Sequence, residues 1–149
     1  MKKYIIKGPT NSISGIVNIN GAKNSCLPLM AASILFKDKV ILKNVPLVKD
    51  VITMKNLLIS LGSKVEISKT NKMIIKNSKP HKRRVPYKLV STMRAGVLTM
   101  GSLLGRYQKK KIYVAKGGGC SLGIRDINYH LSGFESLAAE HRLEKGYVR

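Results

Sequence analysis

The sequence predicts an α/β fold in which one unit occurs twice. The expected order of elements, helix, strand, helix, strand, strand, appears two times along the 149 residues. Matched residues also keep regular separations, since Lys23 and Arg94 lie 71 residues apart and Leu61 and Leu137 lie 76 apart. The separation grows by five residues, so the second copy carries an insertion, and a spacing of this kind indicates an internal repeat.

In the first copy, apolar residues at helical spacing predict the helices, and short apolar runs bounded by turn residues predict the strands. Two strands are expected ahead of it, over 4–9 and 13–19. Asp50 is expected to cap the second helix and Gly62 to end it. The elements of the copy itself are a helix over 24–36, a strand over 39–43, a helix over 51–61 and a hairpin of strands over 64–67 and 73–76.

A polar stretch flanked by prolines separates the second copy from the first. The elements expected there are a helix over 91–104, a strand over 111–115, a helix over 125–138, a strand over 140–143 and a strand from 147 onward. The predicted organisation is N-terminal strands over 1–20, a first unit over 21–76, a linker over 77–90 and a second unit over 91–149.

Composition limits the class of protein. A hydrophobic share of 44% excludes wholesale disorder, and two cysteines exclude a disulfide-rich secreted scaffold, so a cytoplasmic location is expected. The longest nearly apolar run, over 26–36, is far shorter than the ~20 residues that span a bilayer, so no membrane partner is expected. The two cysteines and three histidines show no metal-ligand spacing, and neither a metal nor a cofactor is expected.

The net charge of +21 raises the question of a nucleic-acid partner. Neutralised phosphates would give such a module much of its affinity. Against this, Lys outnumbers Arg by 21 to 7, the charges are spread along the chain, and the densest clusters, 81–84 and 109–111, contain no aromatic residue. An A/T-rich genome would give the same excess of Lys, Ile and Asn. Nucleic acid is therefore not the expected partner. The positive charge is still expected to attract any anionic ligand over long distances.

The insertion in the second copy, Gly117–Gly123, has the character of a functional loop. Cys120 follows three glycines, which allow the backbone to approach a ligand closely. Arg125 comes soon after, and both a nearby cation and a helix N-terminus lower the pKa of a thiol. Cys120 is either such a reactive thiol or a small apolar side chain in a loop, and spacing leaves both open. Cys26, inside an apolar helix pattern, is expected in the core.

Cations near the predicted helix starts suggest an anion site. Lys23 and Arg94 hold equivalent positions in the two copies, where free backbone N–H groups also attract anions. Together with Arg125 they would form a site for phosphate or carboxylate, or else all three are ordinary exposed cations. Asn24 is either a helix cap or an amide that contacts the same ligand.

Several motifs follow one another along the whole chain. They are Gly21-Ala22-Lys23-Asn24, Asn44-Val45-Pro46, the stretch 86–95, the loop 118–125 and the C-terminal stretch 143–148. This ordered set resembles the UDP-N-acetylglucosamine 1-carboxyvinyltransferase family. The resemblance implies an inside-out α/β barrel of repeated βαβαββ-type units, of which this chain holds an incomplete set. It also implies that the strands expected over 1–20 belong to a second domain that is missing from this chain.

The resemblance also implies an activity and a site. The enzyme transfers the enolpyruvyl group of phosphoenolpyruvate to the 3-hydroxyl of UDP-N-acetylglucosamine, the first committed step of peptidoglycan synthesis, which sustains cell shape and cell division. Cys120 would be the general acid, would form a covalent adduct with phosphoenolpyruvate and would be the target of fosfomycin. Lys23 and Asn24 would bind phosphoenolpyruvate. The residues that would bind UDP-N-acetylglucosamine are Arg94, Arg125, Asp126, Ile127, Asn128 and Tyr129.

Two features depart from the family pattern. Asp126 stands where the family has proline and Asn128 where it has a carboxylate, which alters the nucleotide loop. Family members are also much longer, and the aspartate that serves as their base has no counterpart in this chain. Three hypotheses follow: a transferase portion that is inactive by itself, a decayed remnant without catalysis, and a basic nucleic-acid-binding module.

Overall fold

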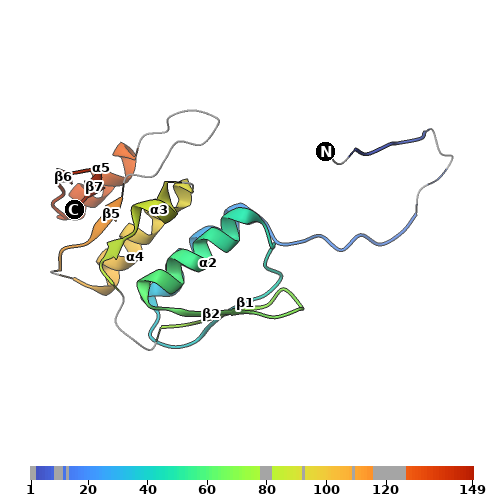
Figure 1. The fold of residues 1–149 in the computed structure, drawn as a ribbon, viewed down its shortest axis with the longest axis horizontal. Coiled ribbons are helices and arrows are strands. Elements are labelled where there is room, and N and C mark those ends of the chain that lie inside the picture. Colours follow the sequence, from blue (N-terminus) through green and yellow to red (C-terminus); the bar gives the residue numbers. More distant parts are fainter. Residues whose placement is uncertain are drawn as a thin grey trace.

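The computed structural model describes residues 3–8, 12, 14–77, 82–91, 93–108, 110–115 and 127–149. Within these ranges the chain forms two α/β units that pack against each other through their helices (Figure 1). Helix contacts between the units run from the first and second helices of one to the helical segments of the other. The two units share a hydrophobic core.

In the first unit, two helices cover one face of an antiparallel sheet. Its elements are α1 (Lys23–Ala32), the 3₁₀ turn η1 (Ser33–Leu35), β1 (Val40–Leu42), α2 (Lys49–Leu61), β2 (Lys64–Ile67) and β3 (Met73–Lys76). The strands lie in the order β1-β3-β2, and Figure 1 shows α2 running above them. Val65, Met73 and Ile75 are buried on the helical side of the sheet, so alternate residues of the strands face solvent.

Helix α2 follows the predicted periodicity closely. Val51, Met54 and Leu58 recur at helical spacing and are fully buried. Gly62 ends the helix with a φ of 117°, and its N–H donates to the carbonyls of Leu58 and Ile59. A residue with a Cβ resists this left-handed conformation, so the predicted stop at Gly62 is confirmed.

The second unit repeats this topology with one strand added. Its elements are β4 (Arg84–Val85), α3 (Tyr87–Val90), the 3₁₀ turn η2 (Arg94–Val97), α4 (Leu98–Arg106), β5 (Tyr113–Ala115), α5 (Asn128–Ser136), β6 (Leu143–Glu144) and β7 (Tyr147–Val148). Strands β5-β7-β6 pair antiparallel in the same order as β1-β3-β2, and β4 adds in parallel to β5. The matching strand order supports the internal repeat.

Four expected segments differ in the structure. The strand expected over 140–143 is β6 at Leu143–Glu144, so residues 140–142 form no strand. The single helix over 91–104 is instead η2 followed by α4, because Met93 is extended (φ −146°, ψ 110°) and interrupts the helical path after α3. The stretch 77–90, expected as a linker, contains β4 and α3. The described residues of 3–20 form no strand; they extend away from the body (Figure 1) with Tyr4, Ile16 and their apolar neighbours exposed.

A hydrogen-bonded junction ties the two units together. Arg106, the last residue of α4, donates from Nη1 to the carbonyls of Ile34 and Phe36, each at 2.6 Å. Buried Asn77 donates from Nδ2 to the carbonyl of Ser33 at 2.6 Å. Arg106 of the second unit thus binds the end of η1 in the first unit, and Asn77 of the connection binds the same segment.

Candidate substrate-binding site

The start of α1 is set by a close backbone contact at Gly21. The N–H of Gly21 donates to the carbonyl oxygen of Asn44 at 3.2 Å. A Cβ at Gly21 would lie 2.2 Å from that oxygen, closer than any side-chain carbon can approach. Glycine in the motif Gly21-Ala22-Lys23-Asn24 is therefore required by sterics, and it fixes where α1 begins.

The motif Asn44-Val45-Pro46 supplies the other side of this contact. Asn44 adopts a left-handed conformation (φ 54°), and its Nδ2 donates to the carbonyl of Ile19 at 3.2 Å. The N–H of buried Val45 donates to the carbonyl of Asn71 at 2.8 Å. These contacts hold the chain before α1, the end of β1 and the β2–β3 turn together, so the two motifs act as one structural unit.

Lys23 and Asp50 form an ion pair between the starts of α1 and α2. Lys23 Nζ lies 3.0 Å from Asp50 Oδ2, and the two side chains are 48% and 37% exposed. The expectation that Asp50 caps α2 is wrong, because Val48 is the N-cap residue and Asp50 lies in the first helical turn. At that position its negative carboxylate still interacts favourably with the positive end of the α2 helix dipole. Sequence reasoning missed the pair, although both residues stand at predicted helix starts.

Arg94 occupies the place in the second unit that Lys23 holds in the first. Lys23 is the first residue of α1, and Arg94 is the first residue of η2, which leads into α4. Segment η2 contacts both α1 and α2, the helices that carry the ion pair. Arg94 is half-buried, and the ion pairs found within the described ranges do not include it. The anion site that Lys23 and Arg94 would share stays a prediction.

The predicted loop residues are only partly described. Cys120, Arg125 and Asp126 lie outside the described residues. Ile127 is buried in the core, whereas Tyr129 is 91% exposed. The side chain of Ile127 thus packs inward, and Asn128, the first residue of α5, is exposed. Asn24 is likewise exposed on α1. Their ligand contacts stay predictions.

Cys26 is buried in α1, as expected. Burial raises the pKa of its thiol, because the charged thiolate is poorly solvated there. In the part of the chain that the structure describes, no group of three His, Cys, Asp or Glu side chains could hold a metal ion. In those same ranges, no helix has the length and apolar character needed to cross a membrane.

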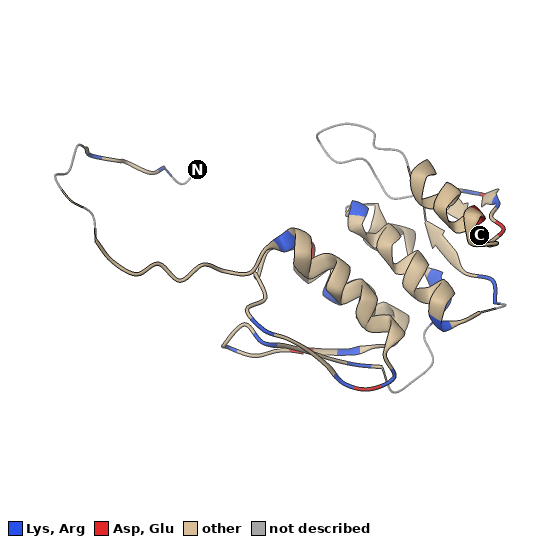
Figure 2. Ribbon diagram, turned by 180° about the vertical axis from the view of Figure 1, so that it is seen from behind, with Lys and Arg blue, Asp and Glu red and all other residues tan. Residues whose placement is uncertain are grey.

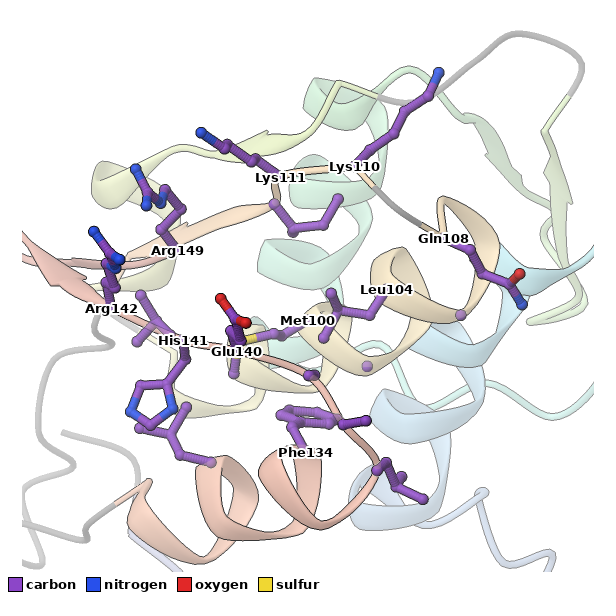
Figure 3. A pocket seen from close by; sticks show the side chains of 18 residues that line it. Met100, Leu104, Gln108, Lys110, Lys111, Phe134, Glu140, His141, Arg142 and Arg149 are labelled. Atoms are coloured by element: carbon purple, nitrogen blue, oxygen red, sulfur yellow. The ribbon is translucent and has the colours of Figure 1, made fainter.

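Two of the cavities in the described part of the chain lie near the elements of the predicted site, but the described site residues line neither of these two. The larger, of about 800 Å³, has an apolar floor from α4 and α5, and Figure 3 shows Met100 and Phe134 at that floor. Lys110 and Lys111 extend from its edge in the same view. The smaller, of about 490 Å³, lies beside the start of α1 and is lined by Gly21, Cys26 and other residues.

The fold is that of an enolpyruvyl transferase. The enolpyruvyl transferase NikO from Streptomyces tendae superimposes with a TM-score of 0.75 over 93% of this chain and 30% of that structure. The sequence identity is 17%, so this likeness concerns the fold alone. It confirms the predicted α/β class and its incomplete set of repeated units.

The chain belongs to the EPSP synthase (3-phosphoshikimate 1-carboxyvinyltransferase) family, whose model matches residues 7–149. Relatives named UDP-N-acetylglucosamine 1-carboxyvinyltransferase match throughout. Those of Magnetococcus marinus, Pelagibacter ubique and Hydrogenovibrio crunogenus are 43%, 42% and 40% identical, over 100%, 99% and 99% of this chain. The chain covers 35%, 34% and 35% of their lengths, or about a third. The resemblance drawn from the motifs is confirmed.

Proposed function

We propose that this chain forms one wall of the active site of a UDP-N-acetylglucosamine 1-carboxyvinyltransferase. The reaction would transfer the enolpyruvyl group of phosphoenolpyruvate to the 3-hydroxyl of UDP-N-acetylglucosamine and release phosphate, in the cytoplasm, as the first committed step of peptidoglycan synthesis. The observation that carries the proposal is identity of 40–43% over essentially the whole chain to relatives of that name. By itself, the chain is expected to bind substrate without turnover.

Lys23 is proposed to hold the phosphate and carboxylate of phosphoenolpyruvate. Ala22 gives α1 no side-chain cap, so backbone N–H groups of the first turn stay available for an anion beside the lysine. Asp50 keeps the ammonium group between the two helix starts, and at 48% exposure Lys23 stays open to a ligand. Asp50 would therefore be a positioning residue, and Asn24 a second contact to phosphoenolpyruvate.

Cys120 is proposed as the proton donor. When the sugar hydroxyl adds to C2 of phosphoenolpyruvate, C3 must receive a proton, and a thiol near neutral pKa suits that role. Loss of phosphate and of a C3 proton then restores the double bond, with cations such as Lys23 stabilising the departing anion. Arg94 and residues 125–129 would bind UDP-N-acetylglucosamine. The base that takes the hydroxyl proton is expected outside this chain.

Calorimetric titration of Lys23→Ala tests the proposal. Phosphoenolpyruvate affinity should fall at least tenfold, the effect of losing about 1.4 kcal/mol, while UDP-N-acetylglucosamine affinity changes little. Lys49→Ala is the matched control, because Lys49 is an exposed lysine next to Asp50 that forms none of the ion pairs of the described chain. Equal losses for both ligands, or an equal effect of Lys49→Ala, would contradict the proposed role. A folded chain that binds neither ligand would support the decayed remnant.

A further inference from the structure

The solvent-facing side of the β1-β3-β2 sheet gathers lysines from distant parts of the sequence. Lys64 stands directly opposite Lys76 in the β2–β3 pair. The β1–β3 register pairs Val40 with Ile75, so Lys39 comes beside Lys76 on its other side. At the opposite end, the pair of Leu42 with Met73 continues to Lys43 and Lys72. We call this surface the lysine face: Lys39, Lys43, Lys64, Lys72 and Lys76, with Ile41, Ile74 and Glu66 among them.

The alternation of the strands fixes which way these lysines point. Residues directly opposite each other in an antiparallel sheet share a face. Met73 and Ile75, which alternate with the lysines of β3, are fully buried under the helices. Lys39, Lys64 and Lys76 are exposed on the other side. Helices thus cover one face of this sheet, and the lysine face is left open to solvent.

The lysine face carries strong uncompensated charge. It holds five lysines and one carboxylate, that of Glu66, for a net charge of +4. Within the described ranges, none of the ion pairs includes any of these side chains. Lys64 and Lys76 are like charges directly opposite each other, an arrangement that destabilises a sheet. Figure 2 shows basic positions along this sheet, and Lys39 and Lys43 lie just outside the two ends of β1. An anion bound between Lys64 and Lys76 would offset this repulsion.

We infer that the lysine face binds the sugar–phosphate backbone of nucleic acid, without sequence preference. The spread of charge along the sequence counts against such a partner, but the sheet register brings five of these lysines together. A linear polyphosphate suits rows of point charges on neighbouring strands, about 4.8 Å apart. Anionic membrane is the weaker match, since membrane-surface binding usually relies on an amphipathic helix with large apolar side chains.

The test compares two triple variants of the whole 149-residue chain. The first is Lys39→Gln/Lys64→Gln/Lys76→Gln. These three lysines lie beside one another at the end of the sheet that is farther from the motif at Gly21. The second, Lys88→Gln/Lys110→Gln/Lys145→Gln, removes the same charge from exposed sites elsewhere. Affinity for a labelled mixed-sequence oligonucleotide, single-stranded and duplex, is measured by fluorescence anisotropy across a salt series. The first variant relieves the opposition of Lys64 and Lys76, so its melting temperature should not fall.

The lysine-face variant should bind at least about tenfold more weakly at moderate salt, and its log–log salt slope should fall by about 2 to 3. The control variant should retain most of the affinity of the unaltered chain. Equal losses in both variants would mean that bulk charge alone attracts nucleic acid, and would overturn the proposal. So would retention on phosphatidylserine vesicles with no oligonucleotide binding, or the absence of any binding by the unaltered chain.

Discussion

The buried side chain of Asn77, directly after β3, gives the sharpest test of the fold, through the substitution Asn77→Ala. Asn77 is 2% exposed, and within the described residues its side chain makes three hydrogen bonds, all to the first unit. It accepts from Ser63 Oγ at 2.7 Å and donates to the carbonyls of Ser33 and Phe36 at 2.6 and 3.2 Å. At about 1 kcal/mol net for each bond, the free energy of unfolding should fall by about 3 kcal/mol. The melting temperature should fall by about 6–12 °C.

Thermal unfolding followed by circular dichroism measures this loss. Asn56→Ala is the matched control, because Asn56 is exposed on α2 and alanine is a better helix former, so stability should stay the same or rise slightly. If Asn77→Ala changes stability no more than the control does, these buried hydrogen bonds do not stabilise the first unit.

Three further predictions concern the site. Gly21→Ala should lower the free energy of unfolding in urea by about 1–3 kcal/mol, because the new Cβ would meet the Asn44 carbonyl. Gly133→Ala is the control, since a Cβ there has nothing within 4 Å, and it should not lower stability. Equal effects of the two substitutions would refute the steric argument. In timed alkylation at mildly alkaline pH, Cys26 should react more slowly than Cys120, since burial raises its pKa and reduces the thiolate fraction; the reverse order would contradict both assignments. In a full-length enzyme, Cys120→Asp should keep activity and prevent fosfomycin adducts, and mass spectrometry that finds the adduct on Cys26 would refute the assignment.

Local sequence rules predicted the elements whose determinants are themselves local. Helix α2 and the β2–β3 hairpin appear where periodicity and Gly62 placed them, because burial and a left-handed stop are visible in the residues alone. The helix expected over 91–104 is interrupted at its start by a turn of the chain at Met93. Val90 packs closely against Gly96, where a Cβ would lie only 3.0 Å from Val90 Cγ1, and the extended Met93 between them turns the chain. Periodicity carries no sign of such a turn.

The strands expected near the N-terminus show that a strand-like pattern alone does not predict a paired strand. Alternation of apolar and polar residues indicates what a segment would bury, yet a strand forms only when another strand accepts its hydrogen bonds. Ile16 and Ile19 remain 94% and 83% exposed, so these residues have the composition of a strand without a paired partner in the described chain. The apolar–polar pattern is present, but a strand also needs hydrogen bonds to a neighbouring strand, and local sequence cannot supply these.

Of the candidate site, helix starts could be predicted and side-chain pairing could not. Motif and spacing predict Lys23 at the beginning of α1, and the structure agrees. Its ion pair with Asp50 depends on how α1 and α2 pack, which no single segment encodes. The lysine face has the same origin, because antiparallel register brings Lys39, Lys64 and Lys76 together across long stretches of sequence.

The starts of the two equivalent helical segments are the proposed binding sites for the anionic substrates of a carboxyvinyl transferase. At 16.5 kDa the chain suits residue-resolved NMR, in which each ligand is titrated into the folded, isotope-labelled protein. Phosphoenolpyruvate should shift the amide signals of residues 21–24, and UDP-N-acetylglucosamine those of Arg94 and residues 125–129. If the folded chain shows no shifts at millimolar ligand, or shifts confined to the lysine face, the proposed substrate site is contradicted.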